Sequence, residues 1–120
     1  MNLHGISGET VVSKAVSPSE SFIVLKTLVP ASSDYFDGHF PEFKLLPAVA
    51  QVDIVSHAAH EYLGTPLSVR NVRRLKFTEK ILPDCTVVLK ITVKGEKVSF
   101  EIKSEDDAVL YSSGNYTVAV

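Results

Sequence analysis

The chain has 120 residues, of which 45% are hydrophobic and 22% charged, the balance of a globular protein and too apolar for a disordered one. Its net charge of −2 argues against nucleic-acid binding, which normally requires a basic excess to neutralise phosphates. A single cysteine excludes an intrachain disulfide and a multi-cysteine metal cage. We therefore expect one domain over residues 1–120.

The start of the chain predicts no targeting segment. Residues 1–5 lack the positive charge and apolar run of a signal peptide, and no later stretch reaches the ~20 apolar residues of a membrane span. The lone cysteine also fits a reducing compartment. We expect an unprocessed, cytoplasmic protein without a membrane span.

The first half of the chain predicts two strands, a loop and a helix. Residues 9–29 are rich in β-branched side chains and are interrupted by Ser17-Pro18-Ser19, which favours two strands joined by a turn. Residues 30–47 follow no period, as a loop would. Residues 48–63, between Pro47 and Gly64, predict one long helix. Apolar residues occur all round this helix, so we expect it to be buried on most sides.

The second half of the chain predicts a sheet. Four strand-like runs, at 66–79, 86–94, 97–104 and 108–120, are separated by turn-forming residues. The fold class is therefore α+β, with an antiparallel sheet of five to six strands wrapped around one long central helix. Such a sheet leaves open edges, which are commonly covered by a two-fold related copy. We expect a homodimer and leave assembly beyond the dimer open.

The densest cluster of chemically capable residues is the loop Tyr-Phe-Asp-Gly-His-Phe-Pro at 35–41, followed by Pro47 and the helix that carries Asp53. It resembles the 3-hydroxyacyl-[acyl carrier protein] dehydratases, which have a Gly-His-Phe-Pro loop and a helical acid fourteen residues beyond the histidine. Asp53 has that spacing from His39. The run 45–53 is also similar to the short dehydratases of aryl-polyene-type pathways. The resemblance implies a hot-dog fold, with His39 and Asp53 as the catalytic pair.

Dehydration of a 3-hydroxyacyl thioester to a trans-2-enoyl thioester needs a base, an acid and donors for the thioester oxygen. His39 is the candidate base, because the pKa of imidazole, ~6.5, lies near working pH. Asp53 is the candidate acid, or the group that orients the water in hydration, and the acid role is supported because burial on an apolar helix would raise the pKa of its carboxyl group. The free N–H groups of the helix start, at Ala48, are the candidate donors.

The resemblance also implies how the substrate binds. The family builds its site across a dimer interface and takes a thioester carried on acyl carrier protein, in fatty-acid or related polyene lipid biosynthesis, without a cofactor. The candidate substrate-binding residues here are Gly38, Phe40, Pro47, Ala48 and Val49. Four apolar side chains are candidates for lining an acyl tunnel: Phe36, Phe40, Phe43 and Leu45.

Three residues depart from the family pattern. Glu42 and Lys44 stand where the dehydratases commonly have Gly and Pro, and Ala48 replaces the glycine that opens the helix. The added methyl group lies where the thioester should approach. Two alternatives therefore stay open: a hot-dog thioesterase in which Asp53 activates water, and a non-catalytic acyl-binding subunit.

Two histidines follow Asp53 on the helix. Asp53, His57 and His60 have the spacing i, i+4 and i+7 and could share a face, but the two histidines lack the spacing of a zinc helix. We predict no metal site and interpret both as surface residues, with an ordinary Asp53–His57 contact as the competing role for the carboxylate.

A basic strip follows the helix, with no acidic residue between Thr65 and Thr78. It consists of Arg70, Arg73, Arg74 and Lys76, with Lys80 just beyond. Such a strip is either a solvated strand face or a docking surface for the acidic acyl carrier protein.

Overall fold

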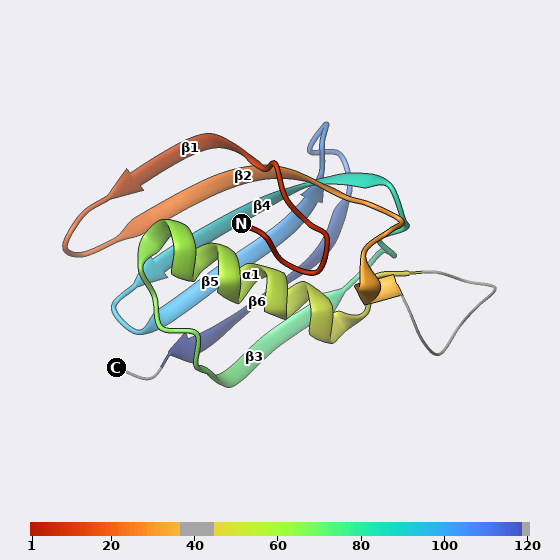
Figure 1. Cartoon of the computed structure of the whole chain (residues 1–120). Helices are drawn as coiled ribbons and strands as arrows, with labels where there is room; N and C mark the ends of the chain where they lie inside the picture. The colour runs from red at the N-terminus through yellow and green to blue at the C-terminus, as the bar shows by residue number, and fades with distance from the viewer. Residues whose placement is uncertain (37–44, 119–120) are drawn as a thin grey trace.

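The computed structural model describes residues 1–36 and 45–118, in which one helix lies against a six-stranded antiparallel sheet (Figure 1). The predicted α+β layout is confirmed. The elements in chain order are β1 (Thr10–Val16), β2 (Ser21–Val29), the 3-10 turn η1 (Asp34–Phe36), α1 (Ala48–Leu63), β3 (Val69–Phe77), β4 (Cys85–Lys94), β5 (Lys97–Ser104) and β6 (Leu110–Val118). The strand order is β1-β2-β4-β5-β6-β3, which places β1 and β3 at the two edges.

The ends of the predicted helix are confirmed. Helix α1 begins directly after Pro47 and ends at Leu63, just before Gly64, which has the left-handed φ of 72° and donates its N–H to the carbonyl of His60. The turn predicted between the first two strands is closed by the N–H of Ser17, which donates to the carbonyl of Glu20. Over the described ranges, no helix has the length and apolar character needed to cross a bilayer.

Helix α1 presents one stripe of side chains to the sheet. Gln51, Ile54, Val55, Ala58 and Ala59 recur at helical spacing and are buried. They face the inward side chains of the central strands, among them Ile23, Leu25, Leu89, Ile91, Val98 and Phe100. Because burial of one large aliphatic side chain is worth about 1.5–3 kcal/mol, this contact fixes the rotation of the helix about its axis.

A second stripe on α1 lies away from the middle of the sheet. It consists of Val49, Val52, Asp53 and Ser56, again at helical spacing, and Val49 is 81% exposed. Every helix residue from Ala50 to Ala59 is nevertheless buried or half-buried, so the predicted burial on most sides is confirmed for the middle of the helix, and the exposed residues lie at its two ends. Apolar residues occur all round α1 because one stripe packs on the sheet and the other lines a groove.

Strand β3 carries two bulges. Its pairing with β6 slips between Arg70 and Arg73 and again between Arg73 and Lys76, and Asn71 and Arg74 take left-handed φ values of 49° and 54°. Each bulge adds one residue and so shifts the alternation of side chains by one position. As a result Val69, Val72, Leu75 and Phe77 all face the same groove.

The N-terminal segment is tied to the far end of α1. The hydroxyl of Tyr62 donates a hydrogen bond of 2.5 Å to the Glu9 carboxylate, which also pairs with the Met1 ammonium. Burial alone would raise the pKa of Glu9, but the hydrogen bonds from the ammonium and from Tyr62 outweigh it and lower that pKa. Ile6, in this segment, is fully buried in the core.

Gly114 lets β6 pass beneath the second bulge. A Cβ atom at this position would lie 2.5 Å from Cδ2 of Leu75 and 3.2 Å from the ring of Phe100. We predict that Gly114→Ala lowers the free energy of unfolding by about 1–3 kcal/mol, since Leu75 must move. Urea unfolding of this variant, of Leu75→Ala and of the double variant measures the effect. The loss should shrink in the Leu75→Ala background, and equal losses in both backgrounds would contradict a clash with Leu75.

Candidate active site

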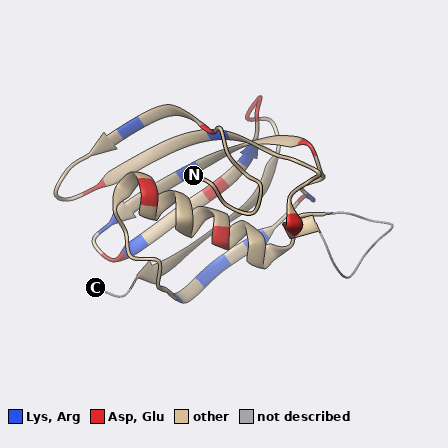
Figure 2. Cartoon of the chain, in the orientation of Figure 1, with Lys and Arg blue, Asp and Glu red and all other residues tan. Residues whose placement is uncertain are grey.

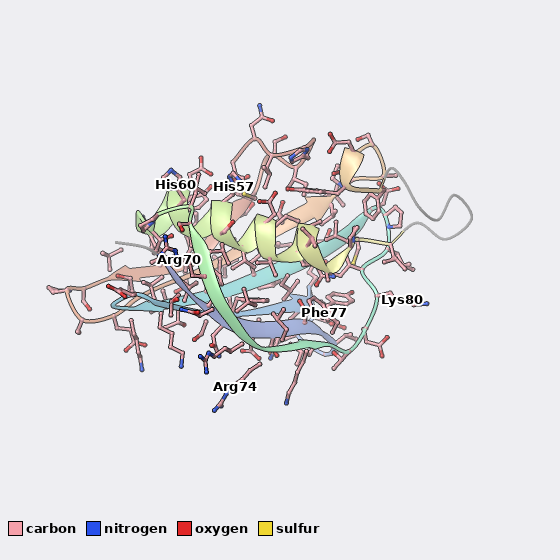
Figure 3. All side chains as sticks on the ribbon, turned by 90° about the horizontal axis from the view of Figure 1, so that it is seen from below. His57, His60, Arg70, Arg74, Phe77 and Lys80 are labelled. Carbon is pink, nitrogen blue, oxygen red and sulfur yellow. The ribbon has the colours of Figure 1, made fainter. Side chains whose placement is uncertain are left out.

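A groove of about 640 Å³ lies between the second stripe of α1 and the inner face of β3. Val49 and Val52 line it from the helix, and Val72, Leu75 and Phe77 line it from the strand. Figure 3 shows Phe77 on the helix side of β3. The groove is therefore apolar along most of its length, with Asp53 and Tyr35 as polar groups in its wall.

Asp53 is held by two side chains of its own chain. The hydroxyl of Tyr35 donates a hydrogen bond of 2.5 Å to its Oδ2, and Nε2 of His57 lies 3.4 Å from its Oδ1. The contact with His57, one of the two roles foreseen for this carboxylate, is thus present. The Asp53 side chain is 39% exposed, so the burial expected from the sequence is absent in the single chain. The open groove beside it leaves this carboxylate in contact with water.

Tyr35 is well suited to donate to a carboxylate. Burial raises the pKa of its hydroxyl, and the hydrogen bond to Asp53 and the charges of Asp53 and Asp34 raise it further. The hydroxyl therefore stays protonated at neutral pH. The ring also contacts His4, with ring centroids 4.5 Å apart, and Nδ1 of His4 lies 2.7 Å from Oδ1 of Asp34.

The start of α1 opens on the same groove. The first hydrogen bond within the helix runs from the N–H of Gln51 to the carbonyl of Pro47, 3.1 Å away, so the N–H groups of Ala48, Val49 and Ala50 have no acceptor within the helix. Pro47, Ala48 and Val49, three predicted substrate-binding residues, line the groove. Because Ala48, Val49 and Asp53 all line this groove, the free N–H groups and the positive end of the helix dipole lie at the same groove as the carboxylate.

Other predicted site residues lie elsewhere or outside the described residues. His39, Gly38, Phe40 and Phe43 belong to residues 37–44, which are not described. Phe36, the last residue of η1, is only 6% exposed and belongs to the core, and it does not line the groove. Leu45 lines a second groove, on the other side of the helix start.

Gln51 ties the chain that enters the helix to α1 itself. Its side chain is 3% exposed, and its Nε2 donates to the carbonyl of Leu46, 3.1 Å away. The N–H of Leu46 in turn donates to the carbonyl of Ile81. These bonds fix the position of Pro47 and therefore the direction in which the first N–H groups of the helix point.

The basic strip follows β3 along the edge of the sheet. Figure 2 shows its Lys and Arg segments in blue, and Figure 3 shows Arg74 pointing away from the body of the protein. All four predicted docking residues are exposed: Arg70, Arg73, Arg74 and Lys76. The strip lies on β3, which also forms the apolar wall of the groove. This edge strand therefore has an apolar face toward the groove and a basic face toward solvent.

The two helix histidines are surface residues, as predicted. Figure 3 shows His57 and His60 on the same side of α1, and both border a small hollow beneath residues 1–3. Nδ1 of His60 lies 2.7 Å from the carbonyl of Thr65, beyond the end of the helix. Across the described parts of the chain, His, Cys, Asp and Glu side chains do not gather in threes around a possible metal position.

Tyr35 is the site residue to which the sequence assigned no role. It lies 18 residues before Asp53, and nothing in the spacing of a loop residue and a helix residue predicts that they meet. The available signal was its place in the cluster at 35–41, which marks it as a neighbour of the predicted site. Only the packing of η1 against α1 shows the contact.

Known proteins resemble this chain over most of its length. A chain of the dehydratase heterocomplex ApeI:P from Xenorhabdus doucetiae is 26% identical, with a TM-score of 0.73 over 95% of this chain and all of that one. A protein from Erwinia carotovora is 30% identical over 95% of this chain and 94% of that one, with a TM-score of 0.71. The 3-hydroxyacyl-[acyl-carrier-protein] dehydratase FabZ of Streptococcus pneumoniae serotype 4 is 26% identical, covering 92% of this chain and 86% of FabZ.

The fold is shared more widely. Zebrafish thioesterase superfamily member 2 has a TM-score of 0.61 at 13% identity, so that likeness concerns the hot-dog fold alone. The match to the ApeI-like family, described as ApeI dehydratase, extends over residues 15–115 and includes the helix, β3 and the groove between them. The predicted hot-dog fold is confirmed, and this chain belongs to the ApeI-like family of dehydratases.

Proposed function

We propose that this protein removes water from a 3-hydroxyacyl thioester carried on acyl carrier protein, in the cytoplasm and in fatty-acid or related polyene lipid biosynthesis. The observation that carries the proposal is the groove, in which one carboxylate and the free N–H groups of a helix start face an apolar wall. An apolar groove with a few convergent polar groups suits a thioester with a hydrocarbon tail.

The reaction divides between three groups. His39 takes the proton from C2, and the N–H groups at Ala48 and Val49 stabilise the negative charge that develops on the thioester oxygen. Asp53 gives a proton to the C3 hydroxyl, which leaves as water and yields the trans-2-enoyl thioester. The two side chains then exchange one proton through solvent, which restores the starting state.

A second subunit completes the site in this proposal. Strand β3 has an open edge, and three side chains of the groove wall, Val72, Leu75 and Phe77, are each 40–42% exposed. A two-fold related copy placed along this edge would cover them and would withdraw Asp53 from water. The related dehydratase from Xenorhabdus doucetiae is part of a heterocomplex, so a related but different subunit is the alternative partner.

Substitution of the two proposed catalytic side chains tests this function. His39→Ala and Asp53→Asn should each lower the rate of crotonyl-thioester hydration, the reverse reaction, by at least about 100-fold, because each removes a general acid or base. Mass spectrometry of the crotonyl thioester measures the gain of one water. Undiminished hydration by both variants would refute the assignment.

The same assay separates the alternative functions. A thioesterase would release free thiol from the crotonyl thioester, since Asp53 would then activate water against the carbonyl group. A non-catalytic subunit would do neither and would still bind acyl carrier protein. Ala48, whose methyl group lines both grooves at the helix start, is the feature that favours this last alternative.

The shared site predicts complementation between inactive subunits. When His39→Ala and Asp53→Asn proteins are unfolded together and refolded, about half of the dimers should be mixed and about one site in four should regain both residues. The mixture should therefore recover about a quarter of wild-type hydration. Native mass spectrometry confirms that mixed dimers form. Mixed dimers without activity would show that each site lies within one chain.

The basic strip is proposed as the docking surface for acyl carrier protein. Arg70, Arg73, Arg74 and Lys76 lie along the edge of the sheet beside the groove, where an acidic partner could deliver its acyl arm. Charge complementarity of this kind mainly speeds encounter and selects the partner. It should therefore matter for a protein-borne substrate and not for a small one.

Charge reversal tests the strip. Arg73→Glu combined with Lys76→Glu should raise KM for crotonyl-acyl carrier protein by about tenfold or more at low salt, and the difference should fall as ionic strength rises. Activity on crotonyl-pantetheine should be unchanged. Lys14→Glu combined with Lys97→Glu, at exposed positions on β1 and β5, is the matched control. Equal losses on both substrates would argue against docking at this strip.

A further inference from the structure

We propose that Tyr35 is a positioning residue, which holds the Asp53 carboxyl group in the orientation that its chemistry requires. The inference deepens the proposed dehydratase function and rests on it. It starts from the hydrogen bond of 2.5 Å between the Tyr35 hydroxyl and Oδ2 of Asp53, in the wall of the groove.

The hydrogen bond makes the two oxygens of Asp53 different. Oδ2 is occupied by Tyr35, whereas Oδ1 has only the longer contact of 3.4 Å to Nε2 of His57. Within the described residues, no other side chain binds this carboxyl group. A transferable proton therefore belongs on Oδ1. The distribution of the χ2 torsion angle of Asp is broad and two-fold. Without the hydrogen bond from Tyr35, the two carboxyl oxygens of Asp53 could therefore exchange places by rotation about χ2.

Tyr35 is itself held from three directions. Its N–H donates to Oγ of Ser33, 3.3 Å away, and the next residue, Phe36, is buried in the core. His4 lies against the ring and pairs with Asp34, so the N-terminal segment closes over the outer side of Tyr35. A phenol fixed in this way orients the carboxylate without rearrangement during the reaction, which is the condition for efficient positioning.

The pair has a close counterpart at the other end of the helix. Tyr62 donates to Glu9 over the same 2.5 Å, and burial and the carboxylate raise the pKa of Tyr62 in the same way. Neither residue lines the groove. Tyr62→Phe therefore removes an equivalent phenol-to-carboxylate bond at a place where it cannot orient Asp53, and it is the matched control for Tyr35→Phe.

The test is hydration of crotonyl-pantetheine by the wild-type protein, Tyr35→Phe, Asp53→Asn and the double variant. We expect Tyr35→Phe to lower kcat by about tenfold and to change KM by less than about twofold, because orientation of the acid, not affinity, is lost. The same change in the Asp53→Asn background should have no effect, since the group being oriented no longer acts as an acid. Tyr62→Phe should leave kcat unchanged. Thermal unfolding checks that each variant is folded.

Each result has one meaning. A wild-type kcat in Tyr35→Phe, with Asp53→Asn impaired, overturns the positioning role and leaves the proposed function intact. An equal loss in both backgrounds shows a general structural effect and also overturns it. A wild-type rate in Asp53→Asn overturns the proposed function, and the positioning role with it. If Tyr35→Phe does not fold, His4→Ala replaces it, with a smaller loss of about threefold expected in the wild-type background only.

Discussion

The packing of helix α1 on the sheet is the constraint on which the rest of the site depends. Ile54, Val55, Ala58 and Ala59 are almost completely buried against the central strands, so the helix cannot turn about its axis without exposing them. Once that stripe is fixed, helical spacing dictates that Val49, Val52 and Asp53 face sideways, toward β3. The position of Asp53 is thus a consequence of core packing one or two residues away from it.

Much of the fold could be predicted from the sequence, because its signals are local. Pro47 and Gly64 bound the helix, and the serine-proline turn separates the first two strands, as the structure confirms. The bulges of β3 were not predicted, because the left-handed residues that produce them are Asn71 and Arg74, not glycine. The signal was present in the apolar spacing of 69, 72, 75 and 77, which departs from strict alternation twice. The candidate site was predictable only in part, since the contact between Tyr35 and Asp53 joins elements that only tertiary packing brings together.

In the proposed dehydratase, the exposure of Asp53 is the reason for expecting a second subunit at the site. A general acid works best when its carboxyl group is withdrawn from water, yet Asp53 is 39% exposed and the groove wall beside it is open. Strand β3 supplies the means to close it, since its free edge carries the apolar side chains that a second copy would bury. The same contact along β3 would then form the dimer and withdraw Asp53 from water, as its acid role requires.

The position of Ala48 bears on whether the protein is an active dehydratase or a non-catalytic subunit. Ala48 stands at the helix start and lines both grooves, at the position where the sequence resemblance implies a glycine. The N–H group that would receive the thioester oxygen is retained, because alanine differs from glycine only in the side chain. The protein therefore keeps the N–H donor, but the methyl group narrows the path by which the thioester reaches it. This narrowing would exclude acyl groups that are wide near the carbonyl and would still admit narrower ones. Inactivity would instead require that the methyl group exclude the thioester altogether, and the exposed position of Ala48 at the groove rim argues against that.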